Sequence, residues 1–138
     1  MTNIRILLVD DHPSIPGKVA EILKDVGQLV GAISNGLDAV EAAIRECPDV
    51  VVMDISMPIM NGIEAADRLI RMRAGAKILF LTVHEDPEFV SAALATGAVG
   101  YVIKSHMATD LLPAIHEVMA GHRFLSPCLQ TENPTTMT

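Results

Sequence analysis

The stretch VVVMDISMPIMNG, residues 50–62, decides the fold of this chain. It opens with four apolar residues, 50–53, in which apolar and polar positions do not alternate. A continuous β-branched and aliphatic run of this kind is typical of a strand that is covered on both faces. The run ends at Asp54, and Asn61-Gly62 is a turn signal ahead of the next helical pattern. These residues predict a buried strand with an acid at its carboxyl end and a loop that leads into a helix.

The same alternation of an apolar run and a helical pattern extends over most of the chain. The predicted strands are Ile4–Val9, Leu29–Ile33, Val50–Met53, Ile78–Val83 and Val99–Ile103. The predicted helices are Val19–Val26, Leu37–Ile44, Ile63–Met72, Glu88–Ala95 and Leu111–Met119. Strict alternation predicts one parallel sheet with right-handed crossovers, and 138 residues are too few for an eightfold barrel. We therefore predict a doubly wound (βα)5 fold of the α/β class, with five parallel strands in the order 2-1-3-4-5 and helices on both faces.

Prolines and polar residues refine the predicted helix bounds. Pro16 and Gly17 lie early in the first helix, where we expect them to delay its start. Thr109, followed by Asp110, is typical of a helix start. Pro113 lies slightly further along, where it removes one hydrogen bond, so we expect a local adjustment in the first turn and no break.

Composition narrows the class of protein. The core must be aliphatic, because half of the residues are hydrophobic while the chain has no Trp, one Tyr and three Phe. A net charge of -7 argues against a nucleic-acid surface, which needs clustered Lys and Arg. The sequence has no run typical of a signal peptide or a membrane span, and we interpret Cys47 and Cys128 as reduced thiols. We therefore expect a cytoplasmic protein with no membrane partner. Residues 1–127 form the predicted domain, and the polar residues 128–138 a tail or the start of a linker.

Three acids follow the two strands that meet where the winding of this topology reverses. Asp10 and Asp11 end the first strand, and Asp54 ends the third. Singly, each acid could be a solvated loop residue or a helix cap. Together, neighbouring strand ends bring three carboxylates close enough to repel one another. A hard divalent cation such as Mg²⁺, which prefers oxygen ligands, relieves this repulsion.

The fourth and fifth strands deliver two further polar groups to the same edge. They are the hydroxyl of Thr82 and the ammonium of Lys104. Either residue alone would mean little at a strand end. A hydroxyl and an ammonium that face three carboxylates are typical of a site that binds a phosphoryl group.

These residues lie in motifs that resemble those of response-regulator receiver domains in two-component signalling. The motifs are LLVDDHP (7–13), VVMDISMPIMNGIEA (51–65), ILFLTVHED (78–86) and GAVGYVIKS (97–105). The resemblance covers residues 4–127 and implies the flavodoxin-like form of the predicted fold. MNGIEA (60–65) and AGHRFLSP (120–127) are similar to the branch that usually carries a C-terminal helix-turn-helix of the LuxR type.

The resemblance assigns a role to each polar residue. Asp54 is the implied nucleophile that takes a phosphoryl group from a phosphohistidine of a sensor histidine kinase. Asp11, Asp54 and the backbone carbonyl of Ser56 are the implied direct ligands of Mg²⁺, and Asp10 binds it through water. Lys104 contacts the phosphoryl oxygens. These roles make the chain a phosphoacceptor switch that assists only its own phosphorylation and dephosphorylation, and not a turnover enzyme.

The resemblance also implies how the switch is transmitted. Thr82 moves to hydrogen-bond the phosphate, and Tyr101 rotates inward after it. This changes the face formed by the fourth helix, the fifth strand and the fifth helix, where a partner binds or a homodimer forms. The output is then transcription, with DNA bound only through a C-terminal domain outside this chain.

Several positions depart from the pattern or leave an alternative open. Ser105 follows Lys104 where many receivers have a proline with a cis bond, so that geometry is not carried over. Ser56 and His84 lie at positions that vary in the family, and we interpret His84 as a solvated loop histidine. The alternative function is a Mg²⁺-dependent phosphatase with an aspartyl-phosphate intermediate. Such enzymes commonly have a second acid where this chain has Ser56.

Overall fold

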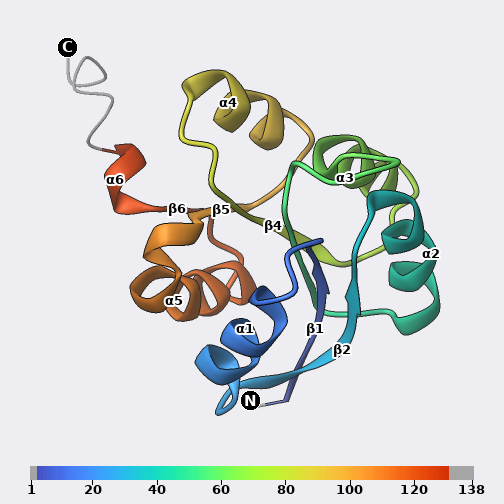
Figure 1. The fold of residues 1–138 in the computed structure, drawn as a ribbon, viewed down its shortest axis with the longest axis horizontal. Coiled ribbons are helices and arrows are strands. Elements are labelled where there is room, and N and C mark those ends of the chain that lie inside the picture. The colour runs from blue at the N-terminus through green and yellow to red at the C-terminus, as the bar shows by residue number, and fades with distance from the viewer. Residues whose placement is uncertain (1–2, 131–138) are drawn as a thin grey trace.

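The structure, a computed structural model, describes residues 3–130. Within this range six parallel strands form one sheet in the order β2-β1-β3-β4-β5-β6 (Figure 1). The strands are β1 (Ile4–Val9), β2 (Gly27–Ile33), β3 (Val50–Met53), β4 (Lys77–Thr82), β5 (Gly100–Ile103) and β6 (Phe124–Leu125). The helices are α1 (Ile15–Leu23), α2 (Gly36–Glu46), α3 (Gly62–Arg71), α4 (Pro87–Ala95), α5 (Met107–Met119) and α6 (Pro127–Gln130).

The predicted α/β class and the order of the first five strands are confirmed, but the prediction of five strands is wrong. A sixth strand, β6, extends the sheet beyond β5, with Tyr101 opposite Leu125. With two residues, β6 is too short to show the apolar pattern by which longer strands are recognised. It follows a turn at Gly121, whose φ of 90° is a conformation that favours glycine.

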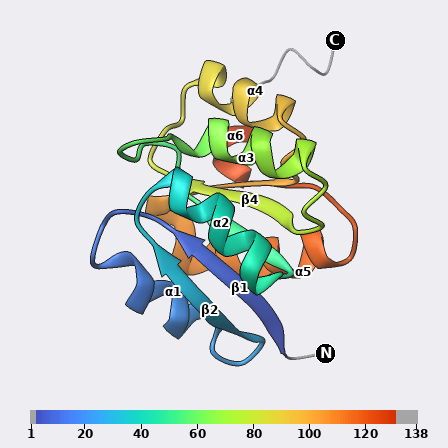
Figure 2. The same ribbon diagram turned by 90° about the vertical axis from the view of Figure 1, so that its right-hand side faces the viewer.

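The two faces of the sheet have separate apolar cores, each with its own helices. Ile6 and Leu8 of β1 pack with residues of α1 and α5, whereas Leu7 and Val9 pack with residues of α2, α3 and α4. Figure 1 shows α1 and α5 together on one side of the sheet and α2 and α3 on the other. In Figure 2, α2, α3 and α4 follow one another along the same face. The central strands are therefore covered on both faces, as their continuous apolar sequences predict.

Helix α1 begins earlier than predicted. It starts at Ile15, with Pro16 in its first turn, and ends at Leu23. The expected delay was wrong because the first backbone N–H groups of a helix have no intrahelical partner, so a proline there removes no hydrogen bond. Val26, which the apolar spacing assigned to this helix, instead lies in the turn before β2, where its N–H donates to the Leu23 carbonyl.

Helix α5 also begins earlier, at Met107 instead of near Thr109. A 3₁₀ turn over Lys104–His106 joins β5 directly to it, so no separate helix start is needed. Pro113 lies in the second turn, and the helix continues past it to Met119. The expectation that Pro113 does not break the helix is confirmed. Every peptide bond among the described residues is trans, which includes the bond between Lys104 and Ser105.

The packed structure extends to the end of the described residues. Residues 127–130, of which the sequence assigned 128 onward to a tail or linker, form α6. Leu129 is buried and belongs to the same apolar core as α4. The remaining predicted tail, 131–138, lies outside the described residues. None of the described helices has the length and apolar character to cross a membrane.

Candidate functional site

The register of the sheet brings the predicted acids together. Val9 of β1 lies opposite Met53 of β3, so the residues that follow them, Asp10 and Asp54, leave the sheet side by side. The N–H of Asp54 donates to the Val9 carbonyl at 2.9 Å, which continues the ladder one step beyond β3. Both carboxylates are buried, with side chains 1% and 3% exposed. The sheet therefore holds two carboxylates, side by side and shielded from water, at the point where its winding reverses.

Lys104 is brought to these carboxylates from the end of β5. Its Nζ lies 2.7 Å from Oδ2 of Asp10 and 3.0 Å from Oδ2 of Asp54. Burial lowers the pKa of Lys104, but its contacts with Asp10 and Asp54 raise the pKa more, and the net pKa is above the ordinary value. The ammonium therefore stays charged and bridges the two buried acids.

His12 completes the cluster, and sequence reasoning missed it. Its Nδ1 lies 2.9 Å from Oδ1 of Asp10, 3.5 Å from Oδ1 of Asp11 and 3.8 Å from Oδ2 of Asp54. The same nitrogen lies 3.0 Å from Nζ of Lys104. The one available signal was its place directly after the two acids in LLVDDHP, because the chain turns there and the His12 N–H donates to the Asp10 carboxylate.

The donor set fits a hard cation. One ligand atom each from Asp10, Asp11, His12 and Asp54 lies within 4.8 Å of the others. Oδ2 of Asp10 is buried and makes no hydrogen bond to a described residue, although it pairs electrostatically with Lys104. Asp11 and His12 are the exposed members, with 37% and 59% of their side chains accessible, so the cluster is open to solvent on one side. Carboxylates that meet at an open edge suit a metal that keeps part of its water.

The loop after Asp54 is shaped by Gly62 at the start of α3. Its N–H donates to the Ile55 carbonyl at 2.8 Å, and a Cβ at this position would overlap the carbonyl oxygen of Asp54. Asn61 caps the helix, since its side chain accepts a hydrogen bond from the N–H of Glu64. Ser56 lies within this loop and is exposed. At the Asn61-Gly62 turn signal, the backbone of Gly62 thus lies directly against the backbone of Asp54.

Thr82, at the end of β4, leads into a second group of contacts that centres on His84. Thr82 is fully buried, and its Oγ1 accepts a long hydrogen bond of 3.4 Å from the His84 N–H. The His84 ring lies 2.7 Å from the Ser56 hydroxyl and stacks on Phe89 of α4, with ring centroids 4.1 Å apart. The interpretation of His84 as a solvated loop histidine is therefore wrong, because its ring links two loops and a helix.

Tyr101 joins this group from β5. Its ring is fully buried, and its hydroxyl donates to the His84 carbonyl at 2.8 Å. The pKa of Tyr101 is raised, first by burial and then by the charges of Asp54 and Asp86. The structure thus has the ring in the inward position, which the sequence-based hypothesis reserved for the phosphorylated state.

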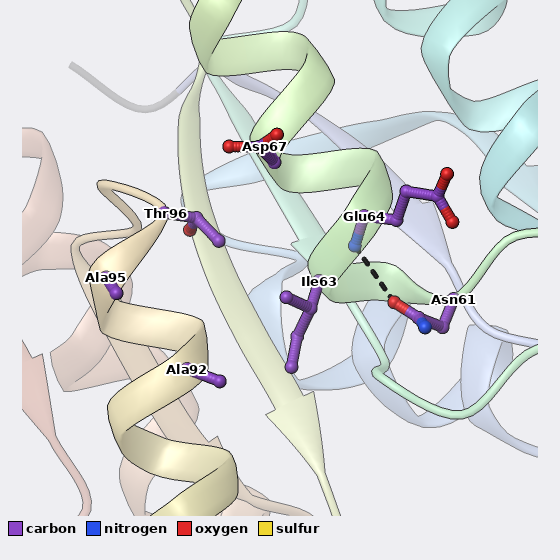
Figure 3. A pocket seen from close by; sticks show the side chains of 7 residues that line it. All are labelled: Asn61, Ile63, Glu64, Asp67, Ala92, Ala95 and Thr96. Atoms are coloured by element: carbon purple, nitrogen blue, oxygen red, sulfur yellow. Dashed lines mark hydrogen bonds between the residues drawn. The ribbon is translucent and has the colours of Figure 1, made fainter.

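A groove between α3 and α4 lies outside this cluster (Figure 3). Glu64 and Asp67 line it on the α3 side, but each lies within reach of an arginine on its own helix, at 3.6 Å and 2.9 Å. Figure 3 shows Ala92 and Ala95 on the facing side of α4, with Thr96 directly after the end of the helix. The groove holds none of the predicted site residues, so the chemistry lies at the ends of β1, β3 and β5.

A profile of the response regulator receiver domain matches residues 6–116. This chain belongs to the response regulator receiver family. It is similar to the response regulator GacA of Pseudomonas viridiflava, with 36% identity over 126 residues, and to the response regulator UvrY of Escherichia coli strain K12, with 37% over 125. The crystal structure of a LuxR-family two-component response regulator from Aurantimonas sp. SI85-9A1 matches with a TM-score of 0.88 and 33% identity, covering 94% of each chain.

The receiver assignment that the motifs predicted is confirmed, as is the likeness to the LuxR-type branch. The alignments cover 90% and 89% of this receiver but 59% and 57% of GacA and UvrY. The chain thus spans less than two thirds of the length of these relatives. A receiver domain is a phosphoacceptor switch, and the buried cluster at the ends of β1, β3 and β5 is where its chemistry is expected.

Proposed function

We propose that this receiver takes a phosphoryl group from the phosphohistidine of a sensor histidine kinase onto the carboxylate of Asp54. The observation that carries the proposal is the ammonium of Lys104, which lies 2.7 Å from Asp10 and 3.0 Å from Asp54 in a buried acidic cluster. In a buried site of low dielectric, the ammonium can also attract an incoming group that carries more negative charge than a carboxylate. A phosphoryl group carries such a charge.

Transfer makes an acyl phosphate. An oxygen of Asp54 attacks phosphorus, the P–N bond to the kinase imidazole breaks, and its electron pair leaves with the imidazole, which takes up a proton. The loose transition state spreads negative charge over three phosphoryl oxygens. Oδ1 of Asp54 accepts the Ile55 N–H at 2.7 Å, which orients the carboxylate, while Oδ2 faces Lys104 at 3.0 Å. Lys104 then exchanges its carboxylate contact for a phosphoryl oxygen.

Mg²⁺ fits the donor set of the cluster. Asp11, Asp54 and the backbone carbonyl of Ser56 would hold it directly, and Asp10 through water. When bound, Mg²⁺ neutralises charge on the carboxylates and on the phosphoryl oxygens. The close approach of carboxylate oxygens of Asp10, Asp11 and Asp54, within 4.8 Å of one another, supports the part of this assignment that rests on the three acids.

Thr82 and Tyr101 are the proposed switch. The Thr82 hydroxyl turns to donate to the phosphoryl group, and this movement further stabilises the inward position of Tyr101, which the ring already has in the structure. In that position the hydroxyl of Tyr101 holds the His84 carbonyl at 2.8 Å, and the His84 ring stacks on Phe89 of α4. A signal at Asp54 thereby reaches the face formed by α4, β5 and α5, where we propose that a partner binds or a homodimer forms.

The output that best fits the relatives is control of transcription. The chain spans less than two thirds of GacA and UvrY, so the proposal is that residues 128 onward lead toward a DNA-binding domain of the LuxR type. DNA contact would belong to that domain, since the receiver has a net charge of -7. The cytoplasmic location expected from the sequence is part of the same proposal.

One experiment separates the switch from the alternative, a Mg²⁺-dependent phosphatase. The protein is incubated with acetyl phosphate and Mg²⁺ while intact mass and free phosphate are followed together. A switch accumulates one phosphoryl group per chain, and free phosphate appears only as that group is lost from the phosphorylated chain. Continuous release over many cycles without accumulation of the phosphorylated chain would favour the enzyme. The hydroxyl of Ser56, which stands where such enzymes have a second acid and lies 2.7 Å from His84, supports the switch.

A further inference from the structure

Ser126, just after β6, is a polar residue that is completely buried outside the acidic cluster. Its N–H donates to the Tyr101 carbonyl at 2.9 Å, which is the last backbone hydrogen bond between β6 and β5. The chain then turns away at Pro127, which has no N–H. The next backbone donor of β5, the N–H of Ile103, donates to the hydroxyl of Ser126 at 3.0 Å. The side chain of Ser126 therefore supplies the acceptor that a further residue of β6 would otherwise provide.

The hydroxyl of Ser126 is held in turn by Asp110 of α5. It donates to Oδ2 of Asp110 at 2.9 Å, and this carboxylate is only 8% exposed. Thr109 lies 3.1 Å from Oδ1 of the same carboxylate. Ser126 thus accepts from β5 and donates to α5, so that a single hydroxyl joins the strand and the helix on either side of the 3₁₀ turn Lys104–His106.

This turn begins with Lys104, the residue that bridges Asp10 and Asp54. Ile103, whose N–H is held by Ser126, directly precedes Lys104, and Asp110 lies in the helix that follows the turn. The family position after Lys104 that often holds a proline is Ser105 here, so the turn lacks the rigidity that a proline ring provides. The hydrogen bonds of Ser126 and Asp110 fix both ends of the turn instead.

We propose that Ser126 and Asp110 are positioning residues that hold the ammonium of Lys104 where it meets the phosphoryl group. The proposal rests on the function proposed above. It also makes the segment after β6 part of the phosphorylation machinery, because loss of its Ser126 contacts would displace Lys104. Neither residue touches the phosphoryl group, so their effect passes entirely through Lys104.

The test measures the affinity for beryllofluoride, a phosphoryl mimic, at saturating Mg²⁺, and separately the affinity for Mg²⁺ alone. Ser126→Ala and Asp110→Ala should each weaken beryllofluoride binding by about tenfold, since small displacements of a reacting group carry penalties of that size or more. Mg²⁺ affinity should not fall, because Lys104 is not a metal ligand and its displacement moves a positive charge away from the carboxylates that hold the metal. Ser126→Thr, which keeps the hydroxyl, should restore most of the affinity for beryllofluoride.

A double-mutant cycle distinguishes positioning from a loss of folding stability. In a Lys104→Met background, Ser126→Ala should have no further effect on beryllofluoride affinity, since the group that it positions is gone. Thr96→Ala is the matched control: it also removes a hydroxyl that donates one hydrogen bond, to the Ala93 carbonyl, and accepts one, from the Ala98 N–H, but at the end of α4. It should leave beryllofluoride binding intact.

The outcomes separate the positioning role from the proposed function. Equal beryllofluoride affinity in Ser126→Ala and the unmodified protein would overturn the positioning role while leaving the proposed function standing. If Ser126→Ala cost the same affinity with and without the Lys104→Met substitution, the positioning role would also be overturned, because the effect would not pass through Lys104. If the unmodified protein bound no beryllofluoride, the proposed function would fail, and the positioning role with it.

Discussion

The ammonium of Lys104 lies 3.0 Å from Oδ2 of Asp54, although 50 residues separate the two in sequence. They meet because β3 and β5 are parallel and lie on either side of β4, so that their carboxyl ends reach the same edge of the sheet. Asp10 shares the ammonium at 2.7 Å. Two buried carboxylates are thus balanced by one cation, and the cluster keeps a net negative charge that a metal can neutralise.

Removal of divalent metal should abolish phosphorylation. Excess EDTA should prevent acetyl phosphate from adding a phosphoryl mass, because the carboxylates then repel the incoming group. Mg²⁺ should raise the melting temperature, since a ligand at one hundred times its dissociation constant adds about 2.7 kcal/mol to the free energy of unfolding. Asp11→Asn should weaken this response, whereas Asp67→Asn, outside the cluster, should not. Undiminished labelling in EDTA would contradict the metal assignment.

The pKa of Tyr101 is raised in the folded protein, mainly by burial, so the phenol should stay protonated beyond its ordinary range. In an unfolded chain a tyrosine ionises at a pH of about 10. The native state therefore binds this proton more tightly, and the stability from it is present below that pH and lost as pH rises above it. Because Tyr101 is the only tyrosine, phenolate absorbance reports it alone. The absorbance should rise together with loss of circular dichroism, and a rise near pH about 10 in folded protein would contradict the burial.

Thr82→Ala should separate phosphorylation from its transmission. The variant keeps Asp54, Lys104 and the metal ligands, so beryllofluoride should still bind. Without the hydroxyl, however, the bound beryllofluoride makes no contact with the side chain of residue 82, so it has no means of favouring one position of the Tyr101 ring over another. The ring NMR signals of Tyr101, with and without beryllofluoride, measure this. A full shift in Thr82→Ala, or none in the unmodified protein, would refute the coupling.

Much of the site could be predicted because its residues lie at the ends of continuous apolar runs. Asp10, Asp54, Thr82 and Lys104 each follow or end such a run, and parallel topology alone requires that these ends share an edge. His12 could not be placed in this way. It belongs to no periodic element, and its position depends on a turn that its own N–H makes with Asp10.

The remaining errors concern short segments and side-chain positions. The strand β6 and the helix α6 contain too few residues for periodicity, and they are held by tertiary contacts such as those of Ser126 and Leu129. Alternation places Tyr101 on a face of β5 but does not say whether its ring points inward. That position depends on the His84 carbonyl, which the sequence does not place.

The most direct test of the account is the identity of the phosphorylated residue. Unmodified protein and Asp54→Asn, which keeps the shape of the side chain but removes the nucleophile, are treated with acetyl phosphate and Mg²⁺. Intact mass spectrometry then follows the addition of a phosphoryl group. We predict one added group on the unmodified chain and none on Asp54→Asn. A phosphoryl group on Asp54→Asn would contradict the assignment of Asp54 as the acceptor.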